Sequence, residues 1–129
     1  MKLSTKVTAF TREDVVDLLS LIISDIDIYE MNLHFDNARY DYCKGVVLAR
    51  KDEEQICYED VLAELLYHDF LYVDDCNEEN THLLTYEKIV EGIELGVSKG
   101  WVNADNSEWD AQDGMNVLQC ALFGDIIYG

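Results

Sequence analysis

The chain has 129 residues, the size of one ordinary domain, and a formal net charge of −18 at pH 7, while 49% of its residues are apolar. This apolar content excludes general disorder and predicts a single domain over residues 1–129. The charge disfavours direct binding to nucleic acid and to anionic membranes, because both need basic residues to replace their counterions.

The first predicted helix covers about residues 12–24. Thr11 is a typical N-cap, and Asp14 three residues later supplies the acidic arm of a capping box. Phe10 and Val15 have the spacing of a hydrophobic staple. Apolar residues then recur at helical spacing, which predicts one buried face.

Two β features are predicted after this helix. Met31, Leu33 and Phe35 alternate with polar residues, which is the pattern of a half-buried strand near residue 33. Residues 46–49 and the pair at 56–57 are short apolar runs on either side of a charged connection, and this pattern predicts a hairpin. Across that hairpin, Cys43 and Cys57 could meet.

The second part of the chain predicts three more helices and another hairpin. Helical spacing marks residues 58–68 and 85–99, and an acidic turn joins two short apolar runs in residues 70–84. The last helix follows Asp110 and ends at Gly124. Residues 125–129 are predicted to dock on the core through Ile126, Ile127 and Tyr128.

These elements predict an α+β fold in which four amphipathic helices pack on a small antiparallel sheet of β-hairpins. On the third helix, Gly92, Gly96 and Gly100 recur at every fourth position. An interior glycine costs about 1 kcal/mol relative to alanine, so the first two need a structural reason. We favour close packing of the fourth helix; the alternative is a glycine-lined pocket for a small molecule or a nucleotide signal.

No sequence motif predicts catalysis, a metal site or a cofactor. The P-loop, the dinucleotide glycine motif and the zinc-protease motif are all missing. The acidic stretch from Asp75 resembles a calcium loop, but Tyr86 stands where a bidentate glutamate is required. The four cysteines are spread singly, which predicts reduced thiols and a cytoplasmic protein, and no apolar run approaches the ~18 residues of a membrane span.

Two segments near the C-terminus carry a recognisable pattern: residues 85–93, and the set Asp110, Ala111, Gln119, Ala121, Leu122, Phe123 and Gly124. In these segments the chain resembles a group of small acidic proteins encoded by phages and integrating elements of gut bacteria. The stretch "TREDVVDLL" near the start is similar too, whereas residues 24–30 differ from the Gly-Gly-Ile-x-Tyr-Trp segment that such proteins often have. The resemblance implies a setting among the accessory genes of a mobile element.

The acidic charge is concentrated in the second part of the chain. Up to Lys51 there are 8 acidic and 7 basic residues, whereas from Asp52 onward there are 19 acidic and 2 basic residues. Such a field attracts a basic surface. We therefore expect a non-enzymatic protein that binds the basic surface of a nucleic-acid-binding protein, as DNA-mimic inhibitors of restriction or CRISPR nucleases do. The candidate contact residues are Asp52, Glu53, Glu54, Asp74, Asp75, Glu78, Glu79, Asp105, Glu108, Asp110 and Asp113.

Overall fold

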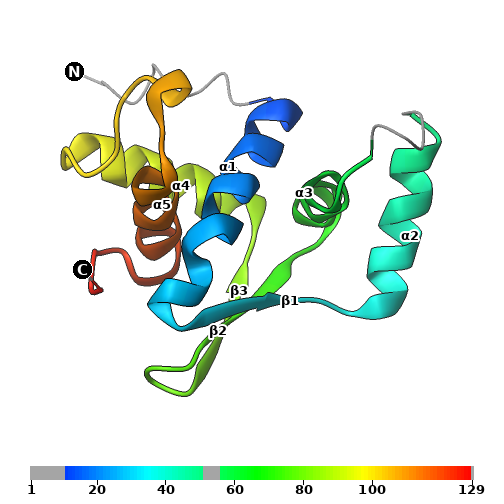
Figure 1. Cartoon of the computed structure of the whole chain (residues 1–129), viewed down its shortest axis with the longest axis horizontal. Coiled ribbons are helices and arrows are strands. Elements are labelled where there is room, and N and C mark those ends of the chain that lie inside the picture. Colours follow the sequence, from blue (N-terminus) through cyan, green and yellow to red (C-terminus); the bar gives the residue numbers. More distant parts are fainter. Residues whose placement is uncertain (1–10, 51–55, 129) are drawn as a thin grey trace.

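A three-stranded antiparallel sheet forms the base of the fold, and the helices lie on one side of it (Figure 1). The computed structural model describes residues 11–50 and 56–128. The strands are β1 (Met31–His34), β2 (Leu71–Asp75) and β3 (Asn80–Leu84), with β2 in the centre. The strand expected near residue 33 and the hairpin expected in residues 70–84 are both confirmed.

The central strand separates buried from outward-facing side chains by simple alternation. Leu71, Val73 and Asp75 are buried on the helix side, whereas Tyr72 and Asp74 are partly exposed. Successive side chains of a strand point to opposite faces, so Asp75 shares the apolar face. This placement of a carboxylate within the core determines much of the geometry described below.

The first helix, α1 (Arg12–Asp25), begins at the predicted capping box. The Thr11 hydroxyl accepts a hydrogen bond from the Asp14 N–H, and the Asp14 carboxylate accepts one from the Thr11 N–H. These bonds satisfy backbone donors that would otherwise lack partners at the helix start. Phe10, the other half of the predicted staple, lies outside the described residues. A short 3₁₀ turn, η2 (Ile26–Tyr29), connects α1 to β1.

Three further helices were predicted correctly. These are α3 (Tyr58–His68), α4 (Tyr86–Ser98) and α5 (Ala111–Phe123). Thr85 caps α4 by accepting from the Lys88 N–H, and Gly124 ends α5 in the left-handed conformation with φ of 72°. The α5 helix packs against both α1 and α4, so the closing apolar segment of the chain is part of the core.

The hairpin predicted from residues 46–49 and 56–57 is wrong, because the first run lies in a helix, α2 (Asn37–Leu48). Asp36 caps it by accepting hydrogen bonds from the Ala38 and Arg39 N–H groups. Cys43 and Val47, four residues apart, bury one narrow stripe against α3. A short apolar run fits a strand or a helix equally well, and here the cap and this spacing decide. The described residues therefore contain five α-helices rather than four.

The glycines of α4 allow two helices to pack at short distance. A Cβ atom on Gly92 would lie 2.8 Å from the Ala121 nitrogen and 2.8 Å from the Val117 oxygen, both backbone atoms of α5. A Cβ on Gly96 would lie 2.5 Å from a methyl carbon of Val102. Close packing is therefore confirmed, and the alternative of an open pocket along Gly92, Gly96 and Gly100 is wrong, because the first two are buried.

A buried carboxylate joins α1, α2 and α3. Glu64 of α3 is 1% exposed, and it pairs with Arg12 at the start of α1 and with Arg50 just beyond α2. His68, one turn further along α3, places its Nε2 at 2.5 Å from Oε2 of Glu64. Burial opposes ionisation, but the Arg50 hydrogen bond, the two arginine charges and the His68 contact outweigh it, so the pKa of Glu64 is lowered.

Substitution of Gly92 by alanine is expected to destabilise the fold by about 1–3 kcal/mol, because the new methyl group would collide with backbone rather than with a mobile side chain. The matched control is Gly45→Ala in α2, where nothing lies within 4 Å of the added Cβ. That control should raise stability by up to about 1 kcal/mol. Urea unfolding of both variants checks this, and equal stability of Gly92→Ala and the parent would contradict the packing.

Glu64→Gln keeps the side-chain shape but removes its charge, and we expect it to lower the free energy of unfolding by about 1–3 kcal/mol near neutral pH. A lowered folded pKa means that the carboxylate stabilises the fold above its unfolded pKa. This contribution is lost as the pH falls through the folded pKa. Stability of the variant should therefore fall less on acidification than that of the parent. Glu91→Gln, at an exposed site on α4, is the control, and parallel pH profiles for all three proteins would contradict the assignment.

Candidate binding site

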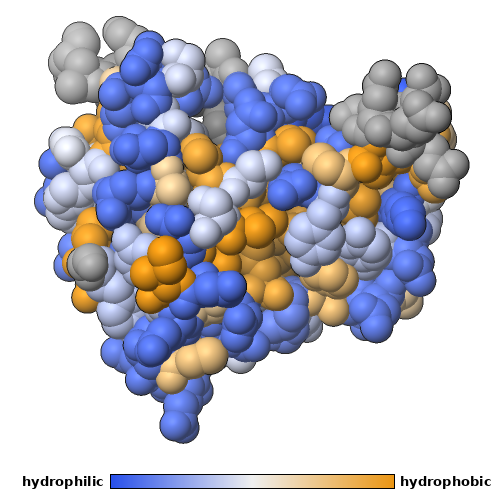
Figure 2. All heavy atoms as spheres, viewed as in Figure 1, coloured by the Kyte–Doolittle hydropathy of each residue, from blue (hydrophilic) through white to orange (hydrophobic). Residues whose placement is uncertain are grey.

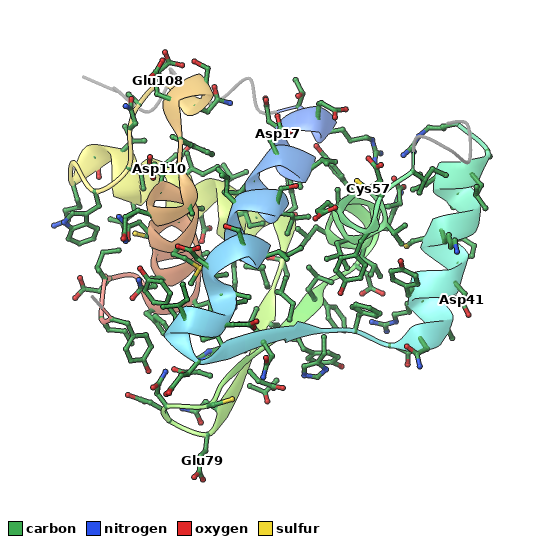
Figure 3. The ribbon with its side chains drawn as sticks, viewed as in Figure 1. Asp17, Asp41, Cys57, Glu79, Glu108 and Asp110 are labelled. Carbon is green, nitrogen blue, oxygen red and sulfur yellow. The ribbon has the colours of Figure 1, made fainter. Side chains whose placement is uncertain are left out.

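The predicted acidic contact residues divide into groups that lie at opposite ends of the molecule. Figure 3 shows Glu79 at the tip of the β2–β3 hairpin and Glu108 and Asp110 at the far end, above α5. Asp52, Glu53 and Glu54 lie outside the described residues. The structure therefore does not bring the hairpin acids and the acids of residues 105–113 onto one continuous face.

The acids near the start of α5 act mainly on local structure. Asp105 accepts hydrogen bonds from the Ser107 hydroxyl and N–H, which lower its pKa. Asp110 and Asp113 form the capping box of α5. The pKa of Asp110 is lowered chiefly by the hydrogen bond from the Asp113 N–H. Glu108 remains exposed within the 3₁₀ turn η4 (Asn106–Glu108).

The hairpin acids have different environments. Asp75 is 1% exposed, so its assignment as a contact residue is wrong: it lies on the helix-facing side of β2. Asp74 is partly exposed on the opposite face, where its Oδ1 accepts from the Thr81 hydroxyl at 2.6 Å and lies 3.1 Å from His34 Nε2. Glu78 and Glu79 are exposed in the turn, and they remain candidates for contact with a partner.

The buried Asp75 carboxylate organises the turn and the C-terminal tail. Its Oδ2 accepts a hydrogen bond of 2.7 Å from the Tyr128 hydroxyl, and its Oδ1 accepts from the backbone and side-chain N–H groups of Asn77. Asn77 also donates to the Tyr29 carbonyl oxygen at 2.9 Å. One carboxylate therefore connects β2, the hairpin turn, η2 and the last described residue.

The tail itself is held by a buried amide. Gln119 of α5 is fully buried, and its Oε1 accepts from the N–H groups of Ile127 and Tyr128 at 3.0 and 2.8 Å. Its Nε2 donates to the Tyr128 carbonyl oxygen. The predicted docking of the tail is confirmed, but hydrogen bonds hold it rather than Ile127, whose side chain is 45% exposed.

An open cavity of about 450 Å³ lies where these segments meet. We call it the corner pocket. It opens beside the projecting hairpin, whose surface is mostly hydrophilic (Figure 2). Side chains from the end of α1, η2, the hairpin turn, α5 and the tail line it, and such convergence of distant segments is typical of binding sites. The lining residues are Asp25, Ile28, Tyr29, Glu30, Asn77, Gln112 and Tyr128.

A chain of hydrogen bonds surrounds the corner pocket. Gln112 Nε2 donates to the Tyr29 hydroxyl at 3.1 Å and to Asn116 Oδ1 at 3.0 Å. Asn116 in turn donates to the Trp101 carbonyl oxygen. With the Asn77 bonds described above, this chain fixes the side-chain amides of the pocket and couples α5 to η2.

The electrostatics of the pocket are those of a neutral phenol held against a carboxylate. Burial opposes the ionisation of Asp75, but the hydrogen bonds from Tyr128 and Asn77 outweigh it, so the pKa of Asp75 is lowered. The hydrogen bond to Asp75 raises the pKa of Tyr128 to about 12. Around neutral pH, Tyr128 therefore donates and Asp75 carries the charge.

Sequence reasoning missed most of this site. Asp25, Tyr29 and Glu30 belong to the segment at residues 24–30, which had no recognisable function in the sequence. Glu30 adopts a left-handed conformation with φ of 59°, which is uncommon for residues other than glycine and not readable from its type. One sequence signal could have identified Asp75: the alternation of side chains along β2 places it on the same face as Leu71 and Val73.

All four cysteines are free thiols; Cys43 and Cys120 are buried, and Cys57 and Cys76 are exposed. A meeting of Cys43 and Cys57 across a hairpin is wrong, because α2 replaces that hairpin. In residues 11–50 and 56–128, no group of three or more His, Cys, Asp or Glu side chains is placed to hold a metal ion.

Comparison with protein-family models, curated proteins and solved structures finds no match for this chain. None of the helices in the described part of the chain is both long enough and apolar enough to cross a membrane. The site is therefore interpreted from its own geometry.

Tyr128→Phe is expected to lower the midpoint of urea unfolding, because it leaves the buried Asp75 Oδ2 without its donor. In the parent, this contact is lost as the pH falls through the lowered pKa of Asp75, and also as the pH rises from the unfolded tyrosine pKa to about 12. The variant should lack the alkaline dependence and show a weaker acid dependence, because Asn77 still donates to Asp75. Tyr42→Phe, at a site that is 71% exposed, is the control, and equal midpoints for the two variants would contradict the role of Tyr128.

Proposed function

We propose that this chain is a non-enzymatic binding protein that docks on a basic protein surface through one acidic end. This end, the acidic corner, comprises Asp25, Asp27, Glu30, Glu78 and Glu79. The observation that carries the proposal is that Asp25 and Glu30 line the corner pocket together with Asn77 of the hairpin turn that bears Glu78 and Glu79. Among the described residues, none that lines the pocket is lysine or arginine. A concentration of one charge sign around a recess focuses the field and steers an oppositely charged partner.

The basic residues of the described chain support this assignment by their positions. Arg12 and Arg50 are paired with Glu64, and Arg39 is paired with Asp69 at 2.9 Å. These three pairs lie around α3 and not at the pocket. These three arginines thus help to hold α1, α2 and α3 together, and none of them is paired with a carboxylate of the acidic corner.

The partner class that we propose is a nucleic-acid-binding protein, such as a host defence nuclease met by a mobile element. Its nucleic-acid channel would present the basic surface, and carboxylates would stand in for phosphates. We assign the contact to the acidic corner rather than to all the predicted acids. Asp105, Asp110 and Asp113 serve the local structure before α5, and they lie at the other end of the molecule.

The proposal is tested by reversing charge at the hairpin tip without disturbing the network around Asp75. The double variant Glu78→Lys, Glu79→Lys should lose capture of a basic protein from nuclease-treated bacterial lysate while its circular dichroism and unfolding midpoint stay close to those of the parent. Capture by the parent should be strong at low salt and should fall at about 1 M salt, where the screening length is only about 3 Å. Added duplex DNA should compete for the captured protein.

The matched control is Glu91→Lys, Glu108→Lys, which makes the same change in net charge at exposed sites away from the hairpin. It should capture the same protein as the parent. Equal loss in both double variants would mean that net charge alone governs binding. An empty pull-down with the parent at low salt would also contradict the proposed function.

A further inference from the structure

We propose that the corner pocket binds a guanidinium group, presented as an arginine side chain by the basic partner. This inference rests on the proposed function and specifies the group that the site recognises. It follows from three properties of the pocket: the hydrogen-bonding capacity that its side chains retain, the charge of its rim, and the kind of surface beside it.

The side-chain donors of the corner pocket are used by the protein itself. Both hydrogens of the Asn77 amide are donated, to Tyr29 O and to Asp75 Oδ1, and both hydrogens of the Gln112 amide go to Tyr29 Oη and Asn116 Oδ1. The Tyr128 hydroxyl donates to Asp75. The Tyr29 hydroxyl donates to Gln112 Oε1 at 3.4 Å. The capacity that remains on these side chains is mostly that of acceptors, namely the remaining lone pairs of the amide and phenol oxygens.

The rim of the pocket adds two carboxylates to these acceptors. Asp25 ends α1 and Glu30 precedes β1, and an ionised carboxylate only accepts hydrogen bonds. A site that offers hydrogen-bond acceptors and negative charge is complementary to a cationic ligand that has only hydrogen-bond donors. A guanidinium has five N–H donors, no acceptor and a permanent positive charge, whereas an ammonium has only three donors at one point.

The remaining lining surface suits the rest of an arginine side chain. Tyr29 and Tyr128 place aromatic rings at the pocket, and the face of an aromatic ring attracts a planar cation. Ile28 is 74% exposed on the same lining, so it offers apolar surface to an aliphatic stem. A volume of about 450 Å³ is within the range of small-ligand pockets.

The inference is tested by titrating the isotope-labelled full chain with acetyl-arginine amide and following the side-chain amide NMR signals of Asn77 and Gln112. We expect saturable shifts with a dissociation constant on the order of 1 mM, the weak end of specific binding. The citrulline analogue has nearly the same shape but no charge, and it should bind at least tenfold more weakly. The lysine analogue should bind several-fold more weakly than the arginine analogue.

Two variants complete the titration. Glu30→Gln should weaken arginine binding several-fold or more, because it removes one rim charge while keeping the shape. Glu108→Gln, at the other end of the molecule, should leave it unchanged. The guanidinium site would be overturned if the citrulline or lysine analogue bound as tightly as the arginine analogue, or if arginine caused no saturable shift. It would also be overturned if Glu30→Gln bound arginine as tightly as the parent.

The two proposals fail separately. If a basic protein is captured and released by salt, but arginine causes no shift and Glu30→Gln still captures the protein, the guanidinium site is wrong and the proposed function stands. If arginine binds as expected while no basic protein is captured at low salt, the proposed function is wrong and the guanidinium site stands.

Discussion

The buried Asp75 carboxylate is the constraint on which the candidate site depends. A charged group that is 1% exposed is tolerated only when hydrogen bonds replace its lost hydration. Asp75 recruits the Tyr128 hydroxyl and the Asn77 amide for this purpose. These partners lie on the C-terminal tail and in the hairpin turn, so satisfying one carboxylate brings the two segments together. The corner pocket is the recess formed where they meet.

Charge is divided between two environments in this protein. Around Glu64, one arginine from α1 and one just beyond α2 compensate a buried carboxylate and hold three helices together. Around Asp75, the neutral donors Tyr128 and Asn77 stabilise the buried carboxylate in place of arginines. The negative charge at the corner is therefore stabilised locally but not cancelled, so it remains available to attract a cationic partner. We propose that the same type of buried group serves cohesion at one end of the molecule and recognition at the other.

The sequence predicted the elements that carry strong local signals. Thr11, Thr85 and Asp110 are caps at the observed helix starts, and glycines four residues apart correctly indicated close packing of α4 on α5. It did not predict α2, whose buried stripe is narrow, because a short apolar run has no distinctive period. The pocket was also missed, since its residues are far apart in the chain and become neighbours only through tertiary contacts.

The most direct test of this account is the titration of the Asp75 carboxyl group, followed by carbon NMR together with the Asn77 side-chain amide signals. We expect a pKa below the usual aspartate range, because Tyr128 and Asn77 stabilise the ionised form. The Asn77 amide signals should shift with the same midpoint. The claim that this carboxylate holds the site together would be contradicted if the pKa of Asp75 were ordinary or raised. It would also be contradicted if the Asn77 signals did not change as Asp75 titrates.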